Sequence, residues 1–101
     1  SFFMNPIIDK NTFMRLLADY PDIPKYDLGD NQIKIPAAWL IEQCGWKGKS
    51  HGKAAVHHIQ QLVLVNTGGA KGTEIAELSD LVRESVLEKF GIEINPEVNF
   101  I

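Results

Sequence analysis

Lysines and histidines gather in one part of the chain that contains no acidic residue. Between Gln43 and Thr73 there is no aspartate or glutamate, and the lysines give this stretch a charge of +4. The rest of the chain holds six basic and thirteen acidic side chains, a charge of −7, which restores the total of −3. The lysines and histidines of the acid-free stretch are Lys47, Lys49, Lys53, Lys71, His51, His57 and His58. Such a stretch attracts anions, and a compact anion such as a phosphate group suits it. A solvated basic loop explains the same charge pattern, so both interpretations stay open.

Other residue types that could carry chemistry do not form a known motif. His57 and His58 are adjacent and point apart on a regular element, and no Cys/His spacing fits zinc, so we expect no metal site. Gly68-Gly69 lies where a phosphate-binding loop would lie, but it lacks the spacing of either glycine-rich phosphate motif. Glu97 stands among apolar neighbours, either on the solvent face of an edge strand or directed into a site. Ser1, taken alone, indicates only a chain end.

The size and composition of the chain indicate one small globular domain over residues 1–101, with 45% hydrophobic and 23% charged residues. Its apolar runs are about five residues long, whereas a membrane-spanning helix needs about 20, so we expect no membrane association. A sequence pI near 5.5 argues against a long nucleic acid as the partner. No secretion leader is recognisable, and the single cysteine, Cys44, suits a reducing compartment. We therefore expect a cytoplasmic location.

The first half of the sequence predicts an extended start, two helices and a short strand. Ser1–Ile8 are expected to be extended, and a helix begins near Asp9–Asn11, where either end residue can cap it. Pro21 ends this helix, whose apolar stripe consists of Phe13, Leu16, Leu17 and Tyr20. After a stretch rich in turns, Gln32–Ile35 alternates as a short strand does. A second helix is expected over Ala37–Cys44, and its buried side holds Trp39, Leu40 and Cys44.

The second half predicts a loop, a buried strand, the longest helix and a closing strand. Residues 45–58 are rich in glycine, lysine and histidine and are expected to form a loop. Leu62–Val65 is a continuous aliphatic run, typical of a central strand buried on both faces. Thr73 is expected to cap a helix whose stripe is Ile75, Leu78, Val82, Val86 and Phe90. Gly91 ends this helix, and Val98–Ile101 follow as a closing strand. The pattern predicts an α+β domain, in which about three helices pack on a small mixed or antiparallel sheet of three to four strands.

The chain opens with S-F-F-M-N-P, which resembles the S-F-F-K-N-P motif of the UDP-N-acetylenolpyruvoylglucosamine reductase family, and three further blocks match in the family's order. Residues 35–48 are similar to its A-A-W-L-I-(D/E)-x-x-G-x-K-G block, and residues 56–66 to its V-H-x-x-(Q/H)-x-L-V-x-x-N block. Glu93–Val98 resembles the closing L-x-P-E-V segment. The blocks cover essentially the whole chain with compatible spacing, so the chain is identified as a member of this family.

The resemblance implies that the chain is the C-terminal, substrate-binding domain of a larger enzyme of bacterial peptidoglycan synthesis. Such an enzyme holds FAD in two domains that would precede Ser1, and NADPH reduces the flavin. The flavin then passes a hydride to C3 of the enolpyruvyl group of UDP-N-acetylglucosamine-enolpyruvate, which gives UDP-N-acetylmuramate. The isolated chain would then bind no cofactor and would be inactive. A stand-alone UDP-sugar- or phosphate-binding module without catalysis is the alternative.

The resemblance also implies roles for individual residues. Ser1 matches the serine that protonates C2 after hydride addition, and Glu97 matches the glutamate that stabilises or protonates the enol intermediate. The residues that match those holding the nucleotide-sugar are Asn5, Tyr26, Lys34, Lys47 and Gln60. Lys47 also lies in the acid-free stretch, which supports its role independently. Met4 stands where the family commonly has a lysine, so one cationic contact is absent or is supplied elsewhere.

Overall fold

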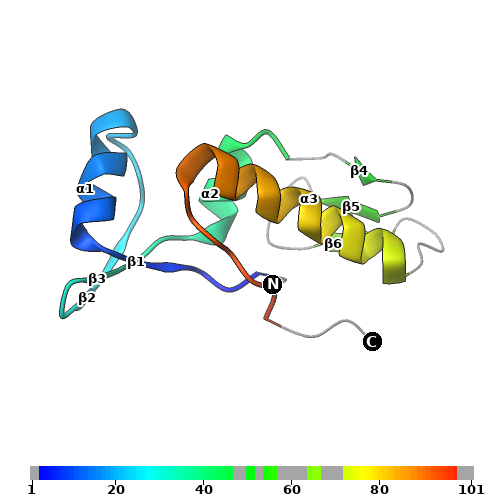
Figure 1. Ribbon diagram of the computed structural model, residues 1–101, viewed down its shortest axis with the longest axis horizontal. Coiled ribbons are helices and arrows are strands. Elements are labelled where there is room, and N and C mark those ends of the chain that lie inside the picture. The colour runs from blue at the N-terminus through cyan, green and yellow to red at the C-terminus, as the bar shows by residue number, and fades with distance from the viewer. Residues whose placement is uncertain (1–2, 47–49, 52–53, 57–63, 67–71, 98–101) are drawn as a thin grey trace.

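The computed structural model describes residues 3–46, 50–51, 54–56, 64–66 and 72–97, which form three helices and six strands (Figure 1). The elements follow one another as β1 (Ile7–Asp9), α1 (Lys10–Asp19), β2 (Tyr26–Gly29), β3 (Gln32–Lys34), α2 (Ala37–Gln43), β4 (Ser50–His51), β5 (Ala54–Val56), β6 (Leu64–Asn66) and α3 (Gly72–Phe90). No helix in this described part of the chain is long and apolar enough to cross a membrane.

The first sheet and α1 form one end of the molecule. Its strand order is β1-β3-β2, and both neighbouring pairs are antiparallel. Asp30 and Asn31 join β2 to β3 with φ angles of 50° and 64°, the positive values that a two-residue type I′ hairpin loop requires. α1 begins where it does because the Asp9 carboxylate accepts a hydrogen bond of 2.7 Å from the Thr12 N–H. The helix packs on β1 and β3 and contributes Phe13 to the core.

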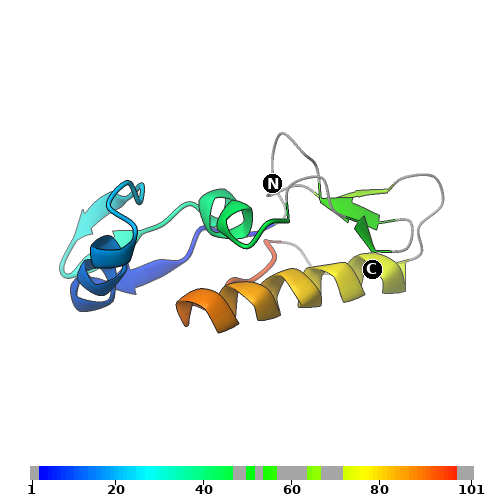
Figure 2. The same ribbon diagram turned by 90° about the horizontal axis from the view of Figure 1, so that it is seen from above.

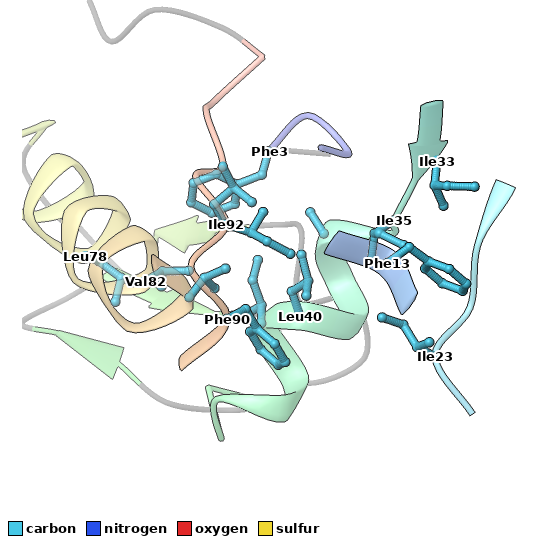
Figure 3. Packing of buried hydrophobic residues seen from close by; sticks show 14 residues of the cluster. Phe3, Phe13, Ile23, Ile33, Ile35, Leu40, Leu78, Val82, Phe90 and Ile92 are labelled. Carbon is cyan, nitrogen blue, oxygen red and sulfur yellow. The ribbon is translucent and has the colours of Figure 1, made fainter. Parts of the chain in front are cut away.

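α2 lies at the centre of the molecule, where it connects the packing of α1 with that of α3. Leu40 and Ile41 of α2 are fully buried. Tyr20 after α1, Trp39 of α2 and Phe90 of α3 pack together with ring centroids 5.3–5.8 Å apart. Among the described residues, the buried cluster runs through all three helices, as Figure 3 shows. It consists of Phe3, Phe13, Ile23, Ile33, Ile35, Ala37, Leu40, Ile41, Leu78, Val82, Val86, Phe90, Ile92 and Ile94.

α3 runs along one side of the molecule (Figure 2), with the second sheet beside its beginning and α2 beside its later turns. The second sheet has strand order β4-β5-β6, again antiparallel throughout. α3 ends at Gly91, whose φ of 69° is a glycine conformation and whose N–H donates to the Leu87 carbonyl at 2.8 Å. From there the chain turns back toward the N-terminal segment (Figure 1).

The predicted α+β class is confirmed, with three helices and antiparallel strands in the described part of the chain. The Asp9 cap and the end of α3 before Gly91 are also confirmed. Both predicted helical stripes face the core, since each of their residues is buried or packs against the buried cluster. The strands differ from the expectation in one respect, because they divide between two three-stranded sheets. α1 packs on β1 and β3 of the first sheet, and α3 packs on the second sheet.

Two local predictions are wrong. Residues 45–58, expected as a loop, contain β4 and β5, which are too short to show an alternating pattern. Of the strand expected at Leu62–Val65, the described residues Leu64 and Val65 lie in β6, which pairs with β5, and its central place in a sheet stays a prediction. Thr73 lies inside α3, which begins one residue earlier, so it is not the cap. The closing strand expected at Val98–Ile101 lies outside the described residues.

Candidate functional site

The two ends of the described chain meet. Phe3 forms an antiparallel bridge with Pro96, and the Met4 N–H donates to the Asn95 carbonyl at 2.8 Å. Phe3 is only 1% exposed, so this contact is anchored in the core. Glu97 follows directly after the bridge and is exposed. Ser1 is two residues before Phe3 and lies outside the described residues, so the structure places Glu97 but not the serine.

A groove of about 280 Å³ runs along this meeting of the two ends. It is lined by Met4, Asn5, Pro6, Ile7, Glu93, Ile94 and Asn95. Met4 and Ile7 expose about half of their surface here, at 53% and 52%. The groove therefore offers apolar contacts beside the amide of Asn5 and the carboxylate of Glu93.

The orientation of the Asn5 amide is set by an internal hydrogen bond. Its Oδ1 accepts from the Ala37 N–H at the start of α2, at 2.9 Å. An amide offers one acceptor oxygen and one donor nitrogen. Because the oxygen accepts this hydrogen bond, the Nδ2 group is the donor that the Asn5 amide can offer to a phosphate or carbonyl oxygen.

Tyr26 and Lys34 are direct partners across two antiparallel strands. Lys34 of β3 is opposite Tyr26 of β2 on one side and opposite Ile7 of β1 on the other. Directly opposed residues share one face of a sheet, so these three side chains form a row across it. Tyr26 is 59% exposed and Lys34 is half-buried. The row meets the groove at Ile7, which belongs to both. The structure thus brings Asn5, Lys34 and Tyr26 to one continuous surface.

The remaining expected binding residues, Lys47 and Gln60, lie outside the described residues. Lys47 follows Trp46, whose indole N–H donates to Ser85 Oγ on α3 at 2.6 Å. The described strands of the acid-free stretch, β4–β6, lie at the opposite end of the molecule from β2 and β3 (Figures 1 and 2).

Arg83 of α3 is a residue of this region that sequence reasoning missed. Its Nε donates to the Ile94 carbonyl at 2.8 Å, and its Nη2 donates to Asn95 Oδ1 at 3.1 Å. Arg83 thus ties α3 to the segment that leads to Glu97. No spacing in the sequence predicts these contacts, because they depend on the chain turning back after Gly91.

Burial raises the pKa of the Cys44 thiol, and this effect outweighs the hydrogen bond to Ser85 and the nearby Lys89 charge. The thiol is therefore protonated near neutral pH and is a poor nucleophile, as expected for a packing residue. The described residues contain no group of three His, Cys, Asp or Glu side chains that could hold a metal ion.

Comparison with known proteins assigns this domain to a family. Residues 1–101 match the family described as "UDP-N-acetylenolpyruvoylglucosamine reductase, C-terminal domain". A UDP-N-acetylenolpyruvoylglucosamine reductase of Bacteroides fragilis is 60% identical over 101 residues, which is 100% of this chain and 30% of that protein. Proteins of the same name from Porphyromonas gingivalis and Burkholderia mallei are 48% identical over 101 residues and 50% identical over 97 residues. These matches cover 100% and 96% of this chain, and 30% and 28% of those proteins.

This protein is therefore a small α+β domain of the class that forms the C-terminal part of reductases. The chain belongs to the C-terminal domain family of UDP-N-acetylenolpyruvoylglucosamine reductases. The resemblance read from the four sequence blocks is confirmed at this level. The chain spans about 30% of the length of the curated relatives it matches.

Proposed function

We propose that this chain is the substrate-binding domain of a larger, NADPH- and FAD-dependent UDP-N-acetylmuramate dehydrogenase of peptidoglycan synthesis. The match over residues 1–101, with identities of 48–60%, is the observation that carries the proposal. The groove at the meeting of the two ends supports it, because Asn5 lines this groove together with Asn95, two residues before Glu97. The single cysteine suits a reducing compartment, and we assign the reaction to the cytoplasm.

The proposed reaction adds a hydride to C3 and a proton to C2 of the enolpyruvyl group. The hydride would come from FAD reduced by NADPH and held in the part of the parent protein outside this chain. The carbon–carbon double bond becomes a single bond, NADPH becomes NADP⁺, and the product is UDP-N-acetylmuramate. This chain would supply the proton that is added to C2 and the side chains that bind the nucleotide-sugar.

Ser1 is the proposed proton donor to C2, and Glu97 its partner at the same carbon. A hydroxyl group is a weak acid in water, but the carbanion that develops at C2 after hydride addition is a strong base, so proton transfer over a short distance is favourable. General-acid help of this kind is worth about 10²–10⁴-fold in rate. Glu97 would stabilise or protonate the enol from the other terminal segment, adjoining the Phe3–Pro96 bridge.

The nucleotide end of the substrate provides the binding energy that positions the small enolpyruvyl group. Asn5 would donate its Nδ2 hydrogens to an oxygen of the nucleotide-sugar. Lys34 and Tyr26 would contact the UDP part from their row on the first sheet, where the lysine charge suits a diphosphate. Lys47 and Gln60 of the acid-free stretch would also bind the UDP part. The charge of +4 on this stretch attracts the diphosphate.

The chain covers 30% of the length of its relatives, so FAD is assigned to the part of the parent protein outside this chain. Residues 1–101 alone are therefore expected to be colourless and without reductase activity. Flavin absorbance that co-purifies with residues 1–101 would contradict this division.

The test of the proposed function uses the full-length protein that carries this chain. With UDP-N-acetylglucosamine-enolpyruvate it should oxidise one NADPH per substrate and yield a product heavier by two hydrogen atoms. NADPH oxidation that does not depend on this substrate would contradict the proposal. A calorimetric titration separates the alternatives: a UDP-sugar module binds UDP-N-acetylglucosamine, and a general phosphate or nucleic-acid module binds a mixed oligonucleotide equally well and loses affinity with salt.

A further inference from the structure

Three residues fix the segment between α3 and Glu97 by contacts that the structure describes. The segment belongs to no helix, and its Pro96 forms an isolated bridge that lies outside the named strands. Ile94 is buried, the Asn95 carbonyl accepts from the Met4 N–H, and Pro96 pairs with Phe3. Glu97 comes next in the chain, so the way these three residues are fixed contributes to its place.

Arg83 contributes two hydrogen bonds to this segment in two directions. Its Nε donates to the Ile94 carbonyl at 2.8 Å, and its Nη2 donates to Asn95 Oδ1 at 3.1 Å. One planar guanidinium thus binds a backbone oxygen and a side-chain oxygen of consecutive residues. A lysine ammonium lacks this fork, so it cannot fix both oxygens with the same geometry.

Two carboxylates flank the guanidinium. Arg83 Nη1 is 3.7 Å from Asp80 Oδ1, and Nη2 is 3.6 Å from Glu93 Oε1. Both carboxylate side chains are largely exposed, at 67% and 70%, so these ion pairs are weak in water. They orient the guanidinium, and the part-buried hydrogen bond to the Ile94 carbonyl holds the segment.

We infer that Arg83 is a positioning residue, which fixes residues 94–95 on α3 and thereby holds Glu97 beside the N-terminal segment. The inference rests on the proposed function, in which Glu97 acts at C2 of the enolpyruvyl group. Arg83 does not belong to the buried cluster, so the fold does not depend on it in the way that it depends on Leu78 or Val82. Because the same segment pairs with residues 3–4, loss of Arg83 also loosens the segment that leads to Ser1.

The test compares Arg83→Met and Arg83→Lys in the full-length protein, with Arg15→Met on α1 as the matched loss of an arginine. Stopped-flow absorbance separates flavin reduction by NADPH from flavin reoxidation by the enolpyruvyl substrate. We expect Arg83→Met to lower the reoxidation rate at saturating substrate by about 10²-fold, a typical loss for a displaced group. We expect Arg83→Lys to fall between this variant and the parent protein. Flavin reduction, substrate KM and the Arg15 variant should change by less than about threefold.

A second pair of variants keeps the inference testable where Arg83→Met folds poorly. Asn95 is exposed, so Asn95→Leu removes one acceptor of Arg83 without disturbing the core, and Asn95→Asp keeps that acceptor. We expect slower reoxidation in Asn95→Leu than in Asn95→Asp, because only aspartate keeps the acceptor for Arg83. Reoxidation rates equal to the parent in both Arg83 variants, or in Asn95→Leu, would overturn the positioning role. Failure of the unsubstituted parent to reoxidise its flavin with this substrate would overturn the proposed function as well, and so the two failures are distinct.

Discussion

Phe3 and Pro96 form an antiparallel bridge that joins the beginning and the end of the described chain. The buried ring of Phe3 anchors this bridge in the core, and the Met4 N–H reinforces it by donating to the Asn95 carbonyl. Two residues that are far apart in the sequence, Ser1 and Glu97, flank the bridge along the chain. The proposed chemistry at C2 needs groups from both ends, and the bridge provides a physical reason why they could act together.

Ser1→Ala in the full-length protein should separate the two half-reactions. The hydroxyl is the proposed proton donor to C2, so its loss should slow flavin reoxidation by the substrate by about 10²–10⁴-fold. Flavin reduction by NADPH should stay near normal, because the hydroxyl takes no part in it. Stopped-flow absorbance measures both steps. An equal fall in both would show that the acid role is wrong.

Asn5→Asp and Asn5→Leu should separate the internal role of Asn5 from its role toward a ligand. Aspartate keeps an acceptor for the Ala37 N–H, whereas leucine leaves that N–H without one, at a cost of about 1–3 kcal/mol in the free energy of unfolding. Both variants lack the Nδ2 donor, so both should lose affinity for the UDP-sugar. Urea unfolding and calorimetric titration measure the two effects. Normal UDP-sugar binding by Asn5→Asp would contradict the donor role.

The helices could be predicted from the sequence because their apolar residues repeat at helical spacing. Leu78, Val82 and Val86 show this plainly, since each is fully buried on one side of α3. β2 was not predictable in the same way, because all its residues are exposed and Leu28 lies in an irregularity of the ladder. No alternation of apolar and polar residues therefore marks it.

The candidate site was only partly predictable for a related reason. Motif resemblance selected Asn5, Tyr26 and Lys34, and the strand register places Lys34 and Tyr26 side by side. The contacts of Arg83 with residues 94–95 are tertiary contacts that depend on the turn after α3, so no local sequence pattern predicts them. The hydrogen bond from Ala37 to Asn5, across 32 positions, is of the same kind.

Leu40→Ala should destabilise the domain strongly, because this side chain is fully buried in α2 between α1 and α3. Truncation of such a leucine costs about 2–5 kcal/mol in the free energy of unfolding. Leu87→Ala on α3 is the matched control, since Leu87 is 52% exposed and its truncation should cost less than about 0.5 kcal/mol. Chemical denaturation measures both. Similar losses for the two leucines would contradict the assignment of the core.

Asp9→Asn should make the free energy of unfolding depend less on pH in the acid range. The hydrogen bond from the Thr12 N–H holds the pKa of the Asp9 carboxyl below its ordinary value. A lowered pKa in the folded state stabilises the fold above the pKa of the unfolded chain, and this contribution is lost as the pH falls through the folded pKa. The parent chain should therefore keep its advantage over Asp9→Asn at neutral pH and lose it as the pH falls from the ordinary pKa of 3.8 through the lower folded pKa. A constant or widening difference in unfolding midpoint over that range would contradict the cap.

The most direct test of the account is a structure of the full-length protein with UDP-N-acetylglucosamine-enolpyruvate bound. The account predicts Ser1 Oγ and the Glu97 carboxylate on the same enolpyruvyl group, each within about 2.6–3.2 Å of a reacting or hydrogen-bonded atom. It also predicts the Asn5 amide nitrogen facing the nucleotide-sugar. A complex with Ser1 and Glu97 on opposite sides of the domain, and the enolpyruvyl group near neither, would contradict it.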